Sequence, residues 1–233
     1  LQMLLDAYKY DSPNNILWDE TDVFLITYGD SIYKENEAPL KTLHAFLNQN
    51  LKLTFSTVHI LPFFPYSSDD GFAVKNFYEV NPQLGTWADV EQIGQSFRLM
   101  GDLVVNHASS QSEWFEQFIN NEPPGKDYFY EPEDGFISDN VIRPRSSPLI
   151  TNFQSVVGVK RAWTTFSADQ VDLNYANPEL LLEVIKIILY YLSKNVSVIR
   201  LDAIAFIWKE SNTQCVHLPE THEIIKLLRK VVD

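Results

Sequence analysis

The chain of 233 residues is 45% hydrophobic and 13% aromatic, which is enough for a sizeable core in a single domain. Its net charge of −13 argues against nucleic acid or an anionic membrane as a partner, although a site inside an acidic protein can still be basic. Cys215 is the only cysteine, which excludes an internal disulfide, and it is better interpreted as a small buried thiol than as a nucleophile. The longest apolar run, at 184–192, is interrupted by Lys186 and is too short to cross a bilayer, and no signal peptide is visible. We therefore expect a cytoplasmic protein.

The first hundred residues alternate between segments with strand patterns and segments with helix patterns. Strands are expected at 23–28, 56–61 and 99–105, and helices at 39–50 and near 87–96. The first of these helices places four apolar side chains on one face, those of Leu40, Leu43, Phe46 and Leu47. Short strands that alternate with helices are typical of βα units and a parallel sheet.

A long excursion at 106–176 follows the third strand. Structureless loops of that length are uncommon, so we expect an inserted subdomain here, with a helix near 112–120. The next helix is expected to begin at Pro178, because Asn177 is a good N-cap and proline suits the first helical position. A fourth strand at 196–202 and a last helix at 219–232 complete the pattern.

Alternation in the fourth strand places Arg200 and Asp202 on the same face. Two residues apart, they lie roughly 6–7 Å from each other at Cα, so the guanidinium can hydrogen-bond the carboxylate, keep it ionised and fix its direction. Such a carboxylate suits a nucleophile, whereas an isolated pair of this kind is more often a structural ion pair. The polar residues gather at the carboxyl ends of the expected strands, where (β/α)8 barrels have their active sites.

Two segments, DLVVNH at 102–107 and RLDA at 200–203, resemble the first two hallmark motifs of glycoside hydrolase family 13, the α-amylase family. The resemblance implies an α/β fold, a (β/α)8 TIM barrel of the α-amylase type, with only about the first four βα units present and an inserted subdomain after strand three. It divides the chain into barrel strands one to three at 1–105, the subdomain at 106–176 and the barrel continuation at 177–233, a fragment truncated before strand five.

In that family, the residue that matches Asp202 is the nucleophile, the one that matches Arg200 orients it, and the one that matches His107 binds sugar hydroxyls. The segment at 62–72 is similar to the sucrose-phosphorylase-like subfamily. Paired acids before glycine are often only a turn, but the resemblance assigns Asp69 to glucosyl hydroxyls and Phe72 to an apolar wall of the pocket. These assignments make chemical sense, because carboxylates accept hydrogen bonds from hydroxyls and aromatic faces pack on sugar C–H groups.

Two arginines in the excursion, Arg143 and Arg145, flank a proline. They could form a solvated basic turn, but the segment resembles the RPR segment of the same phosphorylases, in which the arginine that matches Arg145 is linked to phosphate. A guanidinium fork suits phosphate oxygens.

The end of the excursion and the segment after the fourth strand supply four further candidates. Trp163 and Phe166 could be core residues and Gln170 could lie in a surface loop, but the resemblance places Phe166 and Gln170 at the pocket rim. Phe206 and Lys209 match residues on the acceptor side of the pocket in relatives. From the residues alone, Phe206 would more often be core and Lys209 more often solvated.

The segment at 203–222 is most similar to glucosylglycerate and glucosylglycerol phosphorylases. The resemblance implies a retaining phosphorylase that transfers glucosyl from sucrose or from glucosylglycerate-like or glucosylglycerol-like donors to phosphate. It also implies that a covalent β-glucosyl-enzyme forms and that α-glucose 1-phosphate is released. Inorganic phosphate is then a co-substrate and no cofactor is implied. A metal site is not expected either, since His217 and His222 lack nearby cysteines or further histidines.

Two alternatives stay open. One is a hydrolase or transglucosidase of the same family, and the other is an inert truncated fragment or a carbohydrate-binding relative. A retaining mechanism also needs a second carboxyl group about 5–5.5 Å from the nucleophile. In the family the acid/base glutamate follows strand five and a third aspartate follows strand seven, beyond Asp233, and Glu210, Glu220 and Glu223 are not placed to replace them. We therefore expect the isolated chain to be inactive.

Overall fold

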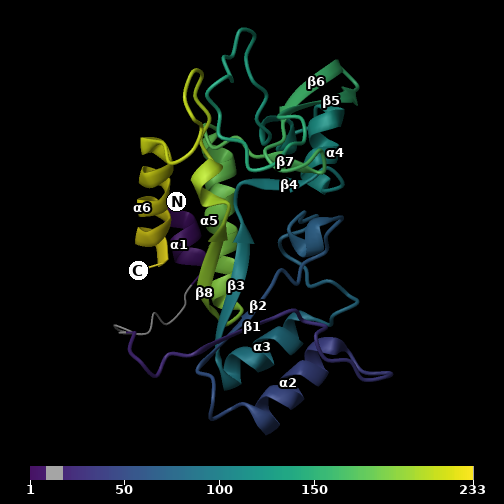
Figure 1. The fold of residues 1–233 in the computed structure, drawn as a ribbon, viewed down its shortest axis with the longest axis vertical. Coiled ribbons are helices and arrows are strands. Elements are labelled where there is room, and N and C mark those ends of the chain that lie inside the picture. Colours follow the sequence, from purple (N-terminus) through teal and green to yellow (C-terminus); the bar gives the residue numbers. More distant parts are fainter. Residues whose placement is uncertain (9–17, 233) are drawn as a thin grey trace.

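A four-stranded parallel sheet forms the centre of the computed structural model, which describes residues 1–8 and 18–232 (Figure 1). Its strands lie in the order β1 (Phe24–Thr27), β2 (Thr57–Ile60), β3 (Arg98–Val104) and β8 (Val196–Asp202). All three neighbouring pairs are parallel. The predicted parallel sheet is confirmed, and each observed strand begins and ends within two residues of its predicted bounds.

The helices that connect these strands begin where the local sequence favours a helix start. Proline occupies the first turn of α2 (Pro39–Asn50), and Asn177 caps α5 (Pro178–Ser193) by accepting a hydrogen bond from the Glu179 N–H at 2.9 Å. A capping box of Thr86 and Asp89 opens α3 (Trp87–Ser96), and the last helix is α6 (Pro219–Val232). The helices α2 and α6 have the predicted bounds, α3 matches the expected segment 87–96, and α5 begins at the predicted Pro178.

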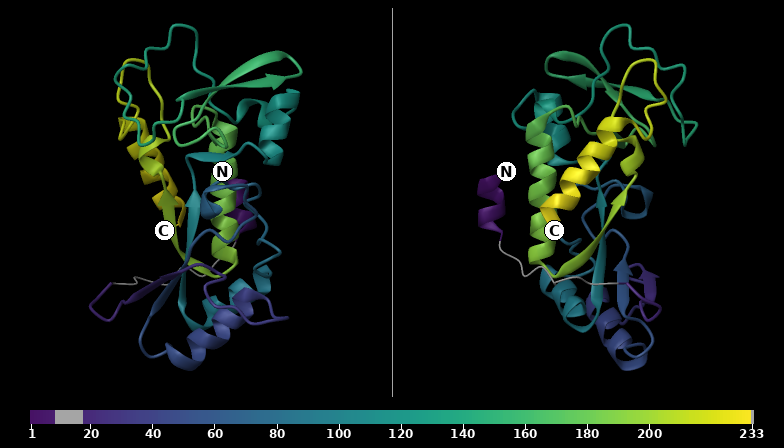
Figure 2. Two further views of the ribbon diagram at one scale, coloured as in Figure 1. Left: turned by 45° about the vertical axis from the view of Figure 1, so that its right-hand side comes forward. Right: turned by 90° about the vertical axis from the view of Figure 1, so that its left-hand side faces the viewer.

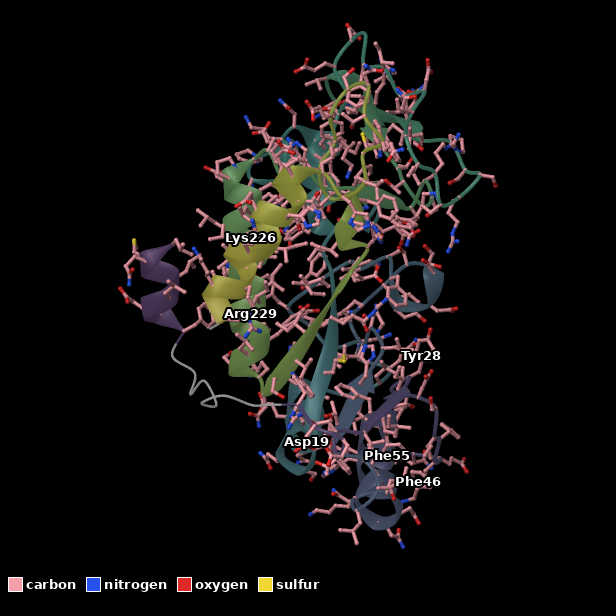
Figure 3. The ribbon with its side chains drawn as sticks, turned by 60° about the vertical axis from the view of Figure 1, so that its left-hand side comes forward. Asp19, Tyr28, Phe46, Phe55, Lys226 and Arg229 are labelled. Carbon is pink, nitrogen blue, oxygen red and sulfur yellow. The ribbon has the colours of Figure 1, made fainter. Side chains whose placement is uncertain are left out.

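Two details of the helices differ from the prediction. A short helix, α1 (Gln2–Ala7), was not expected from the sequence. On α2, Leu40, Leu43 and Leu47 are buried, but Phe46 is 40% exposed and lies on the outer side of the helix (Figure 3). The buried positions follow the i, i+3, i+7 spacing of one narrow face, and Phe46 lies on its flank.

The excursion after β3 folds into small elements at the carboxyl end of the sheet (Figures 1 and 2). Its strands β4 (His107–Ser109) and β7 (Gln170–Asp172) pair antiparallel, as do β5 (Ile150–Ser155) and β6 (Gly158–Trp163). Its helix is α4 (Glu113–Asn120), which the Ser112 hydroxyl caps by accepting from the Phe115 N–H at 3.1 Å. The excursion thus has secondary structure of its own, although the division at residues 105 and 176 stays a prediction.

None of the helices in the described part of the chain is both long enough and apolar enough to cross a membrane.

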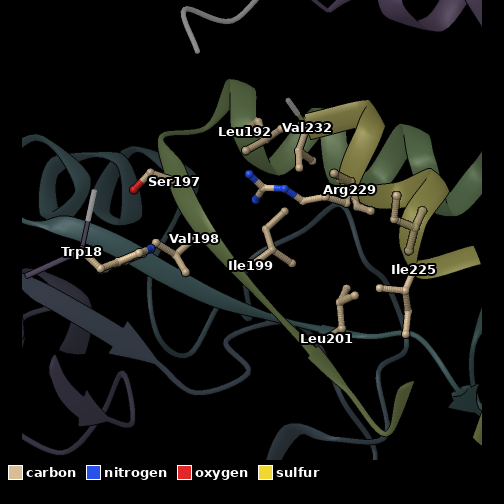
Figure 4. A pocket seen from close by; sticks show the side chains of 11 residues that line it. Trp18, Leu192, Ser197, Val198, Ile199, Leu201, Ile225, Arg229 and Val232 are labelled. Atoms are coloured by element: carbon tan, nitrogen blue, oxygen red, sulfur yellow. The ribbon is translucent and has the colours of Figure 1, made fainter. Parts of the chain in front are cut away.

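The two outer strands of the sheet, β1 and β8, each have one strand neighbour among the described residues. On β1, Phe24 is 38% exposed and Ile26 is 62% exposed. Beside β8, a pocket of about 270 Å³ separates the strand from α6 (Figure 4). Its lining is mostly apolar and includes Leu192, Ile199, Leu201, Ile225, Leu228 and Val232. Both edges therefore expose unpaired backbone groups next to apolar side chains, a combination that favours pairing with another chain.

We expect the isolated 233-residue chain to self-associate through these edges, with size-exclusion chromatography as the measurement. A lysine on an edge strand opposes pairing, so Ile26→Lys should shift the elution toward the monomer. Val157→Lys is the matched control, because Val157 is 63% exposed in the turn between β5 and β6 and should leave the elution unchanged. A sharply melting monomer without either substitution would show that the edges are not open.

Candidate active site

Asp102 lies within β3 and its side chain is completely buried. Its carboxylate oxygens bind groups on the two neighbouring strands. Oδ2 lies 2.7 Å from Nε2 of His59 on β2, and Oδ1 pairs with the guanidinium of Arg200 on β8. The β3–β8 register places Asp102 directly opposite Arg200. Because a buried carboxylate is costly unless it is paired, these contacts fix the Arg200 guanidinium relative to three strands.

The same guanidinium reaches Asp202 at the carboxyl end of β8, with Arg200 Nη1 3.0 Å from Asp202 Oδ1. The contact predicted from the alternation of the strand is therefore present. Burial raises the pKa of Asp202, while the charge of Arg200 acts in the opposite direction. The side chain of Asp202 remains 18% exposed, so its carboxylate is oriented and still accessible.

His107 begins β4 and is buried, and this burial lowers the pKa of its imidazole, which favours the neutral ring. Nε2 lies 2.9 Å from the Phe72 carbonyl oxygen, which can only accept a hydrogen bond. Nδ1 lies 3.3 Å from the Asn106 amide nitrogen, which can only donate. These two contacts favour a proton on Nε2, and the amide nitrogen of Gln170, itself a donor 3.2 Å away, then contacts this N–H without forming a hydrogen bond.

The pairing of β4 with β7 brings Gln170 beside His107, with their Nε2 atoms 3.2 Å apart. The Gln170 amide also donates to Oδ2 of Asp69 at 2.8 Å. Asp69 begins the 3-10 turn η1 (Asp69–Gly71), so the turn that this segment predicts locally is present. This turn carries a solvent-exposed carboxylate next to the His107 ring.

Three partly exposed aromatic rings lie around these polar groups. The Phe166 ring centroid is 5.2 Å from that of His107, and Phe206 meets Phe166 edge-on at 5.6 Å. The Arg200 guanidinium carbon lies 6.0 Å from the centre of the Phe72 ring. Because these rings are not fully covered by protein, they are available as apolar walls for a ligand.

These contacts connect eight of the nine predicted site residues in one network: Asp69, Phe72, His107, Phe166, Gln170, Arg200, Asp202 and Phe206. The ninth, Arg145, is exposed, and no hydrogen bond or ion pair joins it to the others in the described part of the chain. Its segment is connected to them through Ser147, whose hydroxyl donates to the Phe166 carbonyl oxygen at 2.8 Å. The roles of all nine residues stay predictions.

Lys209 and Gln170 differ from their local interpretations as solvated or surface residues, because they are only 8% and 3% exposed. The ammonium of Lys209 turns inward, with Nζ 2.7 Å from Asp172 Oδ2 and 3.2 Å from Asn106 Oδ1. The Lys209 ammonium is therefore not available on the acceptor side of the pocket, where the resemblance placed it. Asp172 also accepts hydrogen bonds from the Asn106 amide at 2.9 Å and from the hydroxyl of Thr165 at 2.6 Å. This buried cluster joins the two ends of the excursion to the loop after β8.

Two other local interpretations are settled by burial. Trp163 is 1% exposed and belongs to the core, and Cys215 is a buried thiol that is 3% exposed. The rings of His217 and His222 stack with centroids 6.0 Å apart.

The sequence interpretation gave no role to His59, Asp102 or Asp172, although Asp102 lies inside one of the quoted motifs. One signal was available, since Asp102 is an ionisable residue within an otherwise apolar strand, and such a residue needs a buried partner. Which residues are the partners depends on strand register and on the return of the excursion, and neither follows from local patterns.

A family model described as the alpha amylase catalytic domain matches residues 47–233. The chain is 54% identical over 241 residues to a glucosylglycerate phosphorylase of Spirochaeta thermophila, a match that covers all of this chain and 41% of that protein. It is 46% identical to a glucosylglycerate phosphorylase of Escherichia coli, over 93% of this chain and 39% of that protein. The chain therefore spans about two fifths of the length of these relatives.

Among solved structures, the sucrose 6F-phosphate phosphorylase from Thermoanaerobacter thermosaccharolyticum superposes with a TM-score of 0.82 at 28% identity. The superposition covers 93% of this chain and 46% of that one. It confirms the predicted fold, which is the first part of an α-amylase-type barrel.

Replacing Lys209 tests the buried cluster. Lys209→Met should lower the free energy of unfolding by about 3–5 kcal/mol, because it leaves the buried Asp172 carboxylate without a cation. Urea unfolding of the full-length protein measures this change. Lys226→Met is the matched control, since Lys226 is 67% exposed on α6 and pairs with the exposed Glu223, so the unfolding midpoint should hardly move (Figure 3). Equal effects of the two substitutions would mean that the Asp172 pair does not stabilise the fold.

Proposed function

Because the chain belongs to the α-amylase family, we propose that it forms the amino-terminal part of a retaining α-glucoside phosphorylase. Its relatives at 46–54% identity are named glucosylglycerate phosphorylases, whereas those named for sucrose or glucosylglycerol reach 28–34%. This difference favours glucosylglycerate as the donor over sucrose and glucosylglycerol. We also propose a cytoplasmic location, which is based on the sequence alone.

One observation carries the proposal: the network of eight residues around an accessible, arginine-bound Asp202. A single contact of this kind is common in structural ion pairs. Here the carboxylate lies at the carboxyl end of a barrel strand, next to a neutral histidine, an exposed carboxylate and three uncovered aromatic rings. That combination supplies a nucleophile, hydroxyl-binding groups and apolar walls in one place, which suits a glucosyl unit.

In the proposed reaction, an oxygen of Asp202 attacks the anomeric carbon of the α-glucoside. The bond from that carbon to the leaving oxygen breaks, and the leaving oxygen takes a proton from a general acid supplied by the remainder of the full-length protein. A hydrogen phosphate oxygen then attacks the anomeric carbon of the β-glucosyl-enzyme from the vacated side and displaces Asp202, while the phosphate proton returns to the conjugate base of the general acid. Two inversions give α-glucose 1-phosphate with net retention and restore the free carboxylate.

Residues of this chain have separate proposed roles in this reaction. Arg200 holds Asp202 ionised and aimed, since a guanidinium 3.0 Å away favours the charged form. Asp69, with its open carboxylate, and His107 are proposed to bind glucosyl hydroxyls. Because Gln170 already donates to Asp69, its position sets where those hydroxyls can lie.

Phosphate is proposed to meet Arg145, whose guanidinium is exposed and forms no ion pair within the described ranges 1–8 and 18–232. The chain has 31 acidic and only 18 basic residues, so an exposed arginine that forms no ion pair among the described residues is an uncommon feature that suits an anion, and Ser147 of the same segment contacts Phe166. The competing function is hydrolysis or transglucosylation, in which water or a sugar replaces phosphate. It differs from phosphorolysis only in the acceptor.

Asp202→Asn should lower turnover of the full-length enzyme by at least about 1,000-fold, because the amide keeps the shape but is not a nucleophile. A fluorinated glucosyl donor should trap the intermediate, and peptide mass mapping should find the label on Asp202. Asp134→Asn, at an exposed aspartate of the excursion, serves as the control and should retain activity. A label on any other residue would exclude Asp202 as the nucleophile.

Arg145→Ala should reduce phosphorolysis at least about tenfold more than it reduces slow hydrolysis of the same glucoside, because only phosphorolysis uses the anion. Rates of both reactions with one donor give this ratio directly. Arg161→Ala is the control, since Arg161 is a half-exposed arginine of the same excursion. Equal losses in both reactions would make Arg145 a structural residue and favour the hydrolase.

A further inference from the structure

Asp169 lies next to Gln170 but is not among the predicted site residues. Its carboxylate accepts hydrogen bonds from four serine hydroxyls. Oδ2 accepts from Ser67 at 2.5 Å and from Ser68, while Oδ1 accepts from Ser110 at 2.7 Å and from Ser109 at 3.2 Å. The backbone N–H of Ser110 adds a fifth hydrogen bond at 3.2 Å. Each carboxylate oxygen thus accepts hydrogen bonds from a different segment of the chain.

The serines belong to the two segments that carry the other hydroxyl-binding candidates. Ser67 and Ser68 come directly before Asp69, and Ser109 and Ser110 follow His107 by two and three residues. Asp169 itself comes directly before Gln170. One carboxylate therefore joins the three segments on which the predicted hydroxyl-binding side chains lie.

The Asp169 carboxylate is held in its charged form by these hydroxyls. Partial burial acts to raise its pKa, but the hydrogen bonds from the serines outweigh burial and lower the pKa. Asp169 forms no ion pair among the residues that the structure describes, so hydroxyl and amide dipoles alone stabilise its charge. Hydrogen bonds to an ionised group are roughly twice as strong as neutral ones, which makes Asp169 an effective anchor for three loops.

The turn that carries Asp69 needs such an anchor. Asp69 and Asp70 have φ angles of 55° and 49°, in the left-handed region that side chains other than glycine rarely adopt. A turn of this kind persists only where surrounding contacts hold it. The Asp69 side chain contributes one hydrogen bond, to Gln170, whereas Ser67 and Ser68 attach the preceding backbone to Asp169.

We propose that Asp169 is a positioning residue, which holds Asp69, His107 and Gln170 in one arrangement for the hydroxyls of the glucosyl donor. The inference rests on the proposed function, because it assumes that these three side chains bind the donor. Asp169 touches no reacting atom. It acts on donor binding and leaves the phosphate acceptor unaffected.

The test is steady-state kinetics of Asp169→Asn in the full-length protein. The amide has the same shape but no charge, and its NH2 group faces serine hydroxyls that must then reorient. The donor KM should rise about tenfold, in line with the loss of charge-assisted hydrogen bonds, while the phosphate KM stays unchanged. Asp134→Asn, exposed in the same excursion, should change neither value. A residue that only stabilises the fold would instead lower kcat and the melting temperature with an unchanged donor KM, and that result would overturn the proposal.

A double-mutant cycle tests whether the serines act through Asp169. Ser110→Ala alone should raise the donor KM, but it should add no further effect in the Asp169→Asn background. Full additivity would overturn the proposed role.

Titration calorimetry with glucose separates this inference from the proposed function. Glucose binding by the wild-type protein that weakens about tenfold in Asp169→Asn supports both. Equal binding by the two proteins overturns the positioning role alone, and no binding by the wild type overturns both.

Discussion

The rest of the structure depends on how the Asp102 carboxylate is neutralised inside the sheet. It cannot be solvated, and it has a hydrogen-bonded histidine on one side and an arginine on the other. Removing either partner would leave a buried charge without compensation, which is among the most destabilising changes a fold can undergo. The strand register and the direction of the Arg200 guanidinium are therefore fixed together. The position of Asp202, two residues further along β8, follows from them.

Outside the sheet, the site is built on loops, and two hydrogen-bonded carboxylates hold these loops together where no strand pairing does so. The Asp172 carboxylate binds an ammonium, an amide and a threonine, and joins the loop after β8 to both ends of the excursion. The Asp169 carboxylate binds serine hydroxyls and joins the loops that carry Asp69 and His107. Loops place functional groups freely but need such fixed points to hold them within catalytic tolerance.

The sequence predicted the elements that depend on local chemistry. Helices with a proline start, an asparagine cap or a strong apolar face, such as α2, α5 and α6, begin at their predicted residues, and the alternation in β8 predicted the contact between Arg200 and Asp202. The features that the sequence did not predict depend on contacts between distant parts of the chain. The partners of Asp102 depend on strand register, and the burial of Lys209 depends on Asp172, which lies 37 positions earlier in the chain. The network around Asp169 joins segments about 100 residues apart, and no local pattern of serines predicts it.

The central claim is that the charge of Arg200 keeps Asp202 ionised against its burial. Burial raises the pKa of Asp202 and the guanidinium opposes that rise. The most direct measurement is the pH dependence of kcat/KM of the full-length enzyme, in the wild type, in Arg200→Lys and in Arg200→Gln. The nucleophile must be deprotonated, so activity is lost as pH falls through its pKa. The account predicts that the acid limb moves to higher pH in Arg200→Gln, where the positive charge is gone, and moves less in Arg200→Lys, where it is kept. An acid limb at the same pH in all three proteins would contradict it.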